Sequence, residues 1–196
     1  NMPNLAGLGL GEALKHSSGL PSPWPKPRHG GWAVAREISK GKDTPSGHWE
    51  LAGVPVPWDW HYFQNETPAF PTKIIQSVAE FVGGSLANCH ASGIEVIDVF
   101  ADQHLKTGFP ICYTSVDSVF QIAAHEDTFG LQRLYDLCSK MAPMLHEMKV
   151  GRVIARPFVG NAEQGFQRTL NRKDFSIDPP SPTLCLSLIH ISEPTR

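Results

Sequence analysis

Thr44 is the residue of this chain whose type and neighbours best suit covalent chemistry. It lies in the segment Gly41-Lys42-Asp43-Thr44-Pro45-Ser46-Gly47-His48-Trp49-Glu50. Threonine is favoured at the N-cap of a helix and proline at the first helical position, so Thr44 and Pro45 predict the start of a helix that runs to about residues 49–52. The unpaired N–H groups and the dipole of such a start would stabilise a phosphate at the Thr44 hydroxyl. The alternative is that Thr44 only caps a surface helix.

Four further segments follow the Thr44 segment and, with it, carry a family resemblance. They are Asn88-Cys89-His90-Ala91-Ser92-Gly93, Tyr113-Thr114-Ser115-Val116-Asp117-Ser118-Val119-Phe120-Gln121-Ile122, Gly151-Arg152-Val153-Ile154-Ala155-Arg156-Pro157-Phe158 and Phe166-Gln167-Arg168-Thr169. In this order, the segments closely resemble the bacterial phosphopentomutases of the alkaline phosphatase superfamily. The resemblance extends from residue 1 to about residue 183.

The resemblance implies that Thr44 is the catalytic residue and carries the phosphoryl group. In that family the threonine acts beside two divalent metals, usually manganese (Mn²⁺), and a sugar bisphosphate is the activator. An unassisted hydroxyl is a weak nucleophile, so metals that lower its pKa and hold the transferring oxygens would be essential.

The resemblance also implies a set of substrate-binding residues for a pentose phosphate. This set is Ser115, Asp117, Val119, Arg152, Ile154 and Arg168. Two arginines suit the non-reacting phosphate because a guanidinium group offers planar, bidentate donors. Asp117 can accept from a ribose hydroxyl, and Val119 and Ile154 would shape the pocket. Without the resemblance, Arg152 would be interpreted as a surface charge on a strand.

The predicted reaction is the interconversion of ribose 1-phosphate and ribose 5-phosphate, and of their deoxy forms, through phospho-Thr44. Two alternatives stay open: a metal-dependent phosphoesterase of the same superfamily, or a non-catalytic fragment that binds sugar phosphates. The family's metal ligands are expected outside this segment. No metal-ligand spacing joins His48, His90 and His125, and residues 125–127 are expected to form a polar turn or a cap.

The predicted fold class is α/β. The resemblance implies a partial alkaline-phosphatase-like core into which a smaller α/β cap is inserted. Residues 1–57 would belong to the core, 58–177 to the cap that recognises substrate, and 178–184 to a hinge that returns to the core. An N-terminal part of the family pattern is expected to be absent. Residues 185–196 resemble a translated cloning or sequencing adaptor and are expected to be foreign to the fold.

Local patterns predict the elements that position these residues. Apolar spacing and terminal glycines predict helices over residues 74–82 and 94–106. A stripe of Leu131, Leu134, Cys138, Met141 and Leu145 predicts a third helix, which Pro143 should kink or shorten. Strands are expected over residues 110–114 and 150–158. The proline-rich spans 20–28 and 54–60 should not be helical.

Composition excludes several classes of partner. The 196 residues carry 17 Lys and Arg against 19 Asp and Glu, with no basic stripe, so nucleic acid is not an expected partner. No apolar run is long enough to span a bilayer and no signal peptide is recognisable, so we expect a cytoplasmic chain without a membrane partner. The scattered cysteines, with Cys112 and Cys138 in apolar patterns, favour buried reduced thiols.

Overall fold

A computed structural model describes residues 2–27, 31–41 and 43–192, with side chains up to residue 189. Residues 28, 42 and 193–196, which belong to the proline-rich span, the Thr44 segment and the adaptor-like tail, lie outside the described residues. The chain divides into two compact units, residues 1–38 and 39–196. The first unit contains the short helices α1 (Pro3–Gly7) and α2 (Leu10–Ser18), followed by the non-helical, proline-rich span that the sequence predicts.

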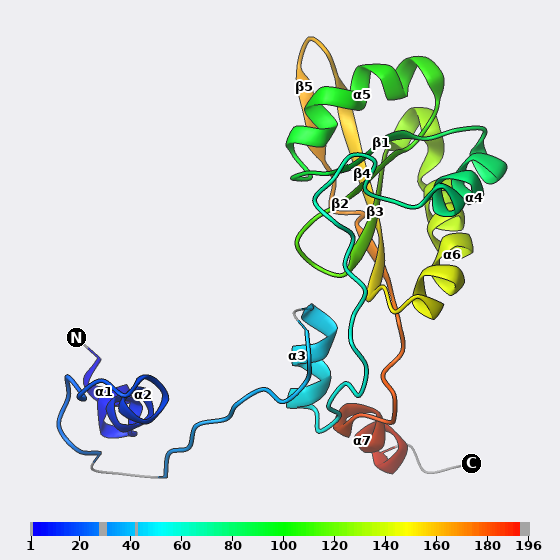
Figure 1. Ribbon diagram of the computed structural model, residues 1–196. Coiled ribbons are helices and arrows are strands. Elements are labelled where there is room, and N and C mark those ends of the chain that lie inside the picture. Colours follow the sequence, from blue (N-terminus) through cyan, green and yellow to red (C-terminus); the bar gives the residue numbers. More distant parts are fainter. Residues whose placement is uncertain (1, 28–30, 42, 193–196) are drawn as a thin grey trace. The chain divides into compact units, whose positions relative to one another are not determined.

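The second unit is built on a mixed six-stranded sheet, which confirms the α/β class (Figure 1). Its strands are β1 (Leu86–His90), β2 (Ile111–Thr114), β3 (Val119–His125), β4 (Arg152–Asn161), β5 (Gly165–Arg168) and β6 (Lys173–Ser176). The order is β1-β2-β3-β4-β5, and β6 also pairs with β4. The β1–β2 and β3–β4 pairs are parallel, whereas the other pairs are antiparallel.

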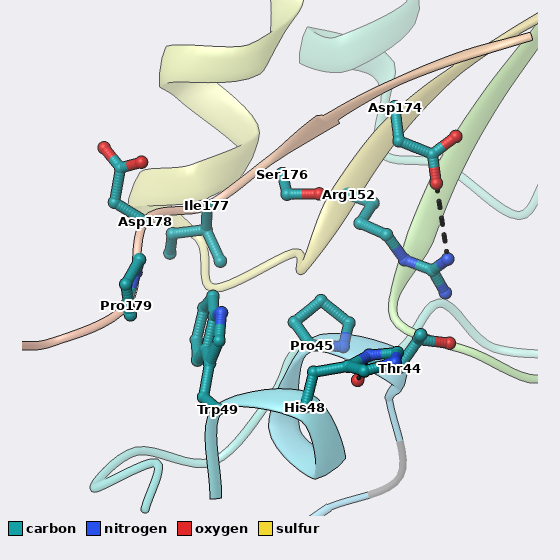
Figure 2. Close-up of a pocket in the computed structure, with 10 residues that line it drawn as sticks. All are labelled: Thr44, Pro45, His48, Trp49, Arg152, Asp174, Ser176, Ile177, Asp178 and Pro179. Carbon is teal, nitrogen blue, oxygen red and sulfur yellow. Dashed lines mark hydrogen bonds and ion pairs between the residues drawn. The ribbon is translucent and has the colours of Figure 1, made fainter. Parts of the chain in front are cut away.

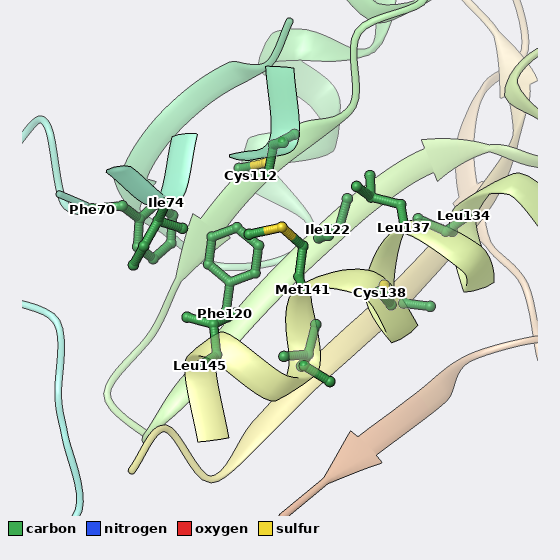
Figure 3. Packing of buried hydrophobic residues seen from close by; sticks show 14 of the residues in the cluster. Phe70, Ile74, Cys112, Phe120, Ile122, Leu134, Leu137, Cys138, Met141 and Leu145 are labelled. Atoms are coloured by element: carbon green, nitrogen blue, oxygen red, sulfur yellow. The ribbon is translucent and has the colours of Figure 1, made fainter. Parts of the chain in front are cut away.

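Helices cover the two faces of this sheet unequally. Helices α4 (Thr72–Val82) and α6 (Leu131–Glu147) cover one face, where they bury the larger core; Phe120, Ile122, Leu137 and Leu145 are fully buried there (Figure 3). On the other face, α5 (Glu95–Thr107) packs over a smaller cluster that includes Phe158. Helix α5 covers only part of this face of the sheet. The uncovered part carries polar side chains of β3, β4 and β6.

The three predicted helices of this unit are confirmed within two residues. Glycines with positive φ follow α4 and α5, as the sequence indicated. Helix α6 differs from expectation because it continues past Pro143 to Glu147 and is not shortened. Pro143 leaves the Ser139 carbonyl without its helical donor, but both residues are exposed, so water can supply the missing hydrogen bond.

The predicted strands over residues 110–114 and 150–158 are confirmed as β2 and β4. In β4 the side chains alternate as expected: Arg152, Ile154 and Arg156 share one face, and Val153 and Ala155 join the core on the other. Strand β4 extends three residues beyond the predicted end because it pairs with β5 there.

Residues 125–127 were expected to form a polar turn or a cap. His125 does occupy the N-cap position of the helical turn that follows, without a side-chain cap hydrogen bond, but the expectation of a polar turn is wrong for it. His125 is the last residue of β3 and is buried, with Nε2 3.0 Å from the Gly160 carbonyl. Glu126 and Asp127 instead open a π-helical turn, η1 (Glu126–Gly130), that leads into α6. The sequence prediction failed because three polar residues in a row concealed a strand end that lies inside the fold.

The second unit has two further short helices. Helix α3 (Thr44–Leu51) follows the extended segment that begins the second unit, and α7 (Leu184–Ser192) is formed by the adaptor-like tail. The two helices are neighbours, since the N–H of Leu184 donates to the Ala52 carbonyl at 3.0 Å. Residues 54–60 between α3 and the sheet are non-helical, as predicted. Within the described residues, no helix combines the length and apolar character needed to cross a membrane.

The described cysteines are unpaired thiols. Cys112 and Cys138 are buried, as the sequence predicted, and burial raises the pKa of both thiols. These two side chains belong to the core between the sheet and α6 and serve as small apolar groups there (Figure 3).

Candidate functional site

Thr44 is the first residue of α3, and its side chain is exposed. The N-cap position is therefore occupied by Asp43 and not by Thr44, which corrects the prediction by one residue. Among the described residues, no side chain caps this helix start, because the carboxylate of Asp43 points elsewhere. The first N–H groups of α3 are consequently oriented toward the space in front of Thr44 and could bind an anion.

Buried contacts behind Thr44 hold α3 in place. The Ser46 hydroxyl accepts a hydrogen bond from the indole N–H of Trp60. Trp49 packs against Trp58 and Trp60, with ring centroids 6.4 and 6.0 Å away. Trp49 lies on α3, and Trp58 and Trp60 lie in the non-helical span that follows it. Their contacts stabilise a short helix that would be unstable by itself.

A pocket of about 380 Å³ opens in front of Thr44 (Figure 2). Helix α3 contributes Thr44, Pro45, His48 and Trp49, and the sheet contributes Arg152 together with residues of β6 and the chain beyond it: Asp174, Ser176, Ile177, Asp178 and Pro179. The guanidinium of Arg152 lies between Thr44 and Asp174 in this view. A hydroxyl and a cation that face one cavity suit a phosphoryl group.

Arg152 is the electrostatic centre of the pocket. It is 7% exposed and contacts three carboxylates. Its Nε lies 3.2 Å from Oδ1 of Asp43, and Nη2 and Nη1 lie 3.5 Å from carboxylate oxygens of Asp117 and Asp174. Arg172 also pairs with Asp174, so two cations face three carboxylates, and an incoming phosphate has to compete with these acids for the Arg152 guanidinium.

Burial raises the pKa of Asp43 from its ordinary value of 3.8 to about 6. The positive charge of Arg152 and the N–H of Ser118 oppose this shift, and the negative charge of Asp117 adds to it. The cost of removing the carboxylate from water therefore outweighs the attraction of its partners.

Several predicted substrate residues lie around Arg152, which shares the pocket with Thr44. Val119 pairs with Arg152 across β3 and β4, and Ile154 follows two positions later on the same face. Asp117 reaches the site through its ion pair with Arg152. Ser115 lies further along, where Nε2 of Gln121 is 3.5 Å from its hydroxyl.

Arg168 is not brought to the same place as Arg152. It pairs with Phe158, six residues beyond Arg152 along β4, which corresponds to roughly 20 Å at the usual rise of a strand. Arg156 lies between these two arginines on the same face, and its Nε donates to Oε1 of Gln121 at 3.0 Å. The arginines thus form a row along the sheet and not a single pair.

A buried tyrosine marks the far end of this row. The Tyr113 hydroxyl is buried without a hydrogen-bond partner among the described residues. Burial raises the pKa of Tyr113, whereas the nearby charges of Arg156, Arg168 and Arg172 lower it. Gly93 leaves room for this arrangement, since a Cβ there would lie 2.7 Å from the hydroxyl and 3.5 Å from Nη1 of Arg168.

Sequence reasoning missed four members of the site: Asp43, Asp174, Arg156 and Gln121. Asp43 precedes Thr44 directly, but the cap was assigned to Thr44, and nothing in the sequence indicated a partner of Asp43 on β4. Arg156 could have been found, because two-residue alternation already places it on the face of Arg152. Asp174 lies on β6, a short strand of polar residues that lacks a recognisable strand pattern.

No group of three or more His, Cys, Asp or Glu side chains that could hold a metal occurs among the described residues. Near Thr44 the carboxylate of Asp43 is engaged by Ser118 and Arg152, and that of Asp174 by Arg152 and Arg172. The residues present therefore do not form a site for the two metals that the resemblance implies.

An exposed hydroxyl at a helix start, opposite an arginine, has the chemistry that suits a phosphoryl group. Comparison with known proteins finds similar chains of one kind. The chain is 51% identical to a phosphopentomutase of Pseudoalteromonas translucida over 94% of its length, 50% identical to that of Actinobacillus succinogenes over 98%, and 52% identical to that of Rhizobium leguminosarum bv. trifolii over 96%. The resemblance predicted from the five segments is confirmed.

The chain spans about half the length of the curated relatives it matches, namely 46% to 50% of these three. No protein-family model matches the chain.

Proposed function

We propose that this chain is the Thr44 segment and substrate-recognition part of a phosphopentomutase, which interconverts (deoxy)ribose 1-phosphate and (deoxy)ribose 5-phosphate. The observation that carries this proposal is the exposed Thr44 hydroxyl, which faces Arg152 across a pocket at an uncapped helix start. The relatives named phosphopentomutase support the same reaction class. Phospho-Thr44 would transfer its phosphoryl group to the free hydroxyl of the bound sugar phosphate, and the Thr44 hydroxyl would then take the other phosphoryl group from the resulting bisphosphate.

The row of arginines supports an orientation for the substrate. Arg152 lies at Thr44 and is surrounded by carboxylates, so it suits the reacting phosphate, which enters and leaves. Arg156 and Arg168 make no ion pair among the described residues, so they suit the phosphate that stays bound. Val119 and Ile154 would contact the ribose between the two phosphates, and Asp117 could accept from a ribose hydroxyl.

The domain assignment is part of this proposal. Residues 1–57 would belong to an alkaline-phosphatase-like core, 58–177 to the inserted cap and 178–184 to the return hinge. The relatives' family implies two divalent metals, usually Mn²⁺, and a sugar bisphosphate activator. The metals would lower the pKa of the Thr44 hydroxyl. Since the described residues offer no metal cluster, their ligands would come from parts of the protein that this chain does not carry.

Replacement of Thr44 tests the assignment. In a complete protein that carries this segment, Thr44→Ala should abolish mutase turnover and phosphorylation by a bisphosphate, both of which mass spectrometry and a coupled assay can follow. The matched control is Thr72→Ala, because Thr72 is also the exposed first residue of a helix, α4, but does not line the pocket. Turnover in Thr44→Ala would contradict the nucleophile assignment.

Two measurements separate the alternatives. Release of inorganic phosphate from ribose 5-phosphate, without formation of ribose 1-phosphate, would favour a phosphoesterase. The 196-residue chain alone should show no conversion even with added Mn²⁺, because a threonine hydroxyl without metals is a poor nucleophile at neutral pH. Measurable conversion by this chain would mean that metal ligands lie within it.

A further inference from the structure

Asp43 occupies the N-cap position of α3 but does not cap the helix. An aspartate there normally accepts a hydrogen bond from the second or third N–H of the helix. Here the carboxylate turns away from α3 toward the sheet, and its side chain is fully buried. A buried carboxylate that gives up its local partner requires compensating contacts elsewhere.

Those contacts come from the start of β3 and from β4. The backbone N–H of Ser118 donates to Oδ2 of Asp43 at 2.9 Å, and Nε of Arg152 lies 3.2 Å from Oδ1. Both partners are more than seventy residues away in sequence. They join the residue next to Thr44 directly to the sheet that bears the proposed substrate residues.

Ser118 is itself firmly held. Its hydroxyl donates to the His61 carbonyl at 2.6 Å and accepts from the Gly151 N–H at 3.0 Å. Gly151 leaves the space for the carboxylate, since a Cβ at this position would lie 3.3 Å from Cγ and Oδ1 of Asp43. Three separate chain segments, at His61, Ser118 and Gly151, thus form the surroundings of the Asp43 carboxylate.

We propose that Asp43 is a positioning residue that latches the Thr44 helix to β3 and β4 and fixes the guanidinium of Arg152 toward the pocket. This inference rests on the proposed function. It divides Arg152 into two parts: Nε forms a buried ion pair with Asp43 at 3.2 Å, without an aligned hydrogen bond, whereas the Nη atoms donate long hydrogen bonds of 3.5 Å to Asp117 and Asp174 that a phosphate can replace. By accepting from Ser118, Asp43 also leaves the helix start uncapped for the anion at Thr44.

Amide hydrogen exchange on the 196-residue chain tests the latch without reference to activity. In Asp43→Ala, the Ser118 amide should exchange about 10- to 150-fold faster, because it loses a hydrogen bond to a charged acceptor. Amides of α6, such as that of Leu137, should not change. The control is Asp59→Ala, which removes an exposed carboxylate (75% exposed) and should leave Ser118 unaffected.

A second variant keeps the test decisive if Asp43→Ala fails to fold. Asp43→Asn keeps the side-chain volume but makes the acceptor of the Ser118 N–H neutral, and it should accelerate Ser118 exchange by at least about 3-fold while α6 stays protected. Unchanged exchange at Ser118 in the folded variants, or equal acceleration at Leu137, would overturn the latch.

Kinetics of a complete protein that carries this segment test positioning as distinct from stability. Asp43→Asn keeps the volume and an acceptor for Ser118 but removes the charge that orients Arg152. We expect kcat to fall at least about 10-fold, with KM for ribose 5-phosphate within about 3-fold of its starting value. Unchanged kcat would overturn the positioning role. If the unsubstituted protein lacked mutase activity, the proposed function would fail, whereas the exchange data would still decide the latch.

Discussion

Arg152 and Arg168 lie on the same face of the sheet, but Arg152 pairs with Val119 beside Thr44 and Arg168 pairs with Phe158, six positions further along β4. A single phosphate close to Thr44 would therefore meet Arg152 first. The two arginines that the resemblance assigns to one phosphate are better explained as opposite ends of a substrate-binding row, with Arg156 between them.

This separation predicts that substitutions of Arg152 and Arg168 have different effects on the kinetics of a complete protein. Arg168→Ala should lower kcat/KM for ribose 5-phosphate about 10- to 150-fold, the loss expected for one charge-assisted contact, because remote binding energy orients the sugar. At saturating bisphosphate, Thr44 should still become phosphorylated. Arg152→Lys should impair both turnover and Thr44 phosphorylation, because a compact ammonium lacks the planar fork by which Nε faces Asp43 while the Nη atoms face a phosphate.

Steady-state kinetics and mass spectrometry of Thr44 provide the measurements for this pair. Arg133→Ala is the matched control. Arg133 lies on α6, where it packs over the ring of Phe129, and it does not line the pocket. Equal loss of Thr44 phosphorylation in the Arg168 and Arg152 variants would contradict the division of the row.

The sequence predicted those parts of the fold that periodic burial encodes. The stripe on α6 and the alternation along β4 follow directly from which side chains must leave water. It did not predict β1, β3, β5 or β6. Strands β5 and β6 are short and largely exposed, so their pairing with β4 leaves little apolar pattern. Strand β3 is buried on both faces and therefore lacks two-residue alternation. The Asp43 contacts were equally inaccessible, since nothing local distinguishes an aspartate that caps a helix from one that binds Ser118 across the fold.

The core between the sheet and α6 should dominate the stability of the second unit. Leu145→Ala should lower the free energy of unfolding by about 2–5 kcal/mol, because Leu145 is fully buried and its truncation leaves a cavity. Leu51→Ala is the control. Leu51 also lies in the last turn of a helix, α3, but it is 86% exposed, so its truncation should lower the free energy of unfolding by less than about 0.5 kcal/mol. Urea unfolding of both variants checks this; similar losses would mean that Leu145 is not held in a packed core.

Gly93 should be intolerant of a side chain for reasons of space. In Gly93→Ala the new Cβ would meet the Tyr113 hydroxyl at 2.7 Å, so either the tyrosine or the 88–93 segment must shift. We expect a loss of about 1–3 kcal/mol in unfolding free energy, together with a changed environment of the Arg168 guanidinium in NMR spectra. Gly7→Ala, where no atom lies within 4 Å of the new Cβ, is the control and should be neutral or slightly stabilising. A neutral Gly93→Ala would show that the Tyr113 end of the row is loosely packed.

His104 should make the fold sensitive to acid. It is 1% exposed, its Nδ1 lies 2.7 Å from the Phe109 carbonyl, and its Nε2 accepts from the backbone N–H of His125 at 2.9 Å. This pattern requires a neutral ring with the proton on Nδ1. Burial lowers the pKa of His104 below its ordinary value of 6.5, and the nearby His125 adds to the effect, whereas the Phe109 carbonyl opposes it.

Because the folded pKa is depressed, the unfolded chain binds the proton first as the pH falls. The contribution of neutral His104 to stability is therefore complete above pH 6.5 and is lost below it, with a slope of up to about 1.4 kcal/mol per pH unit. Urea unfolding of the parent chain and of His104→Gln at several pH values between 7.5 and 5 isolates this contribution as the difference between the two curves. The buried carboxyl of Asp43 titrates in both proteins and so cancels. Parallel curves for the two proteins would contradict a neutral, buried His104. So would NMR evidence that the His104 ring of the parent chain is protonated while the chain is still folded at pH 6.5.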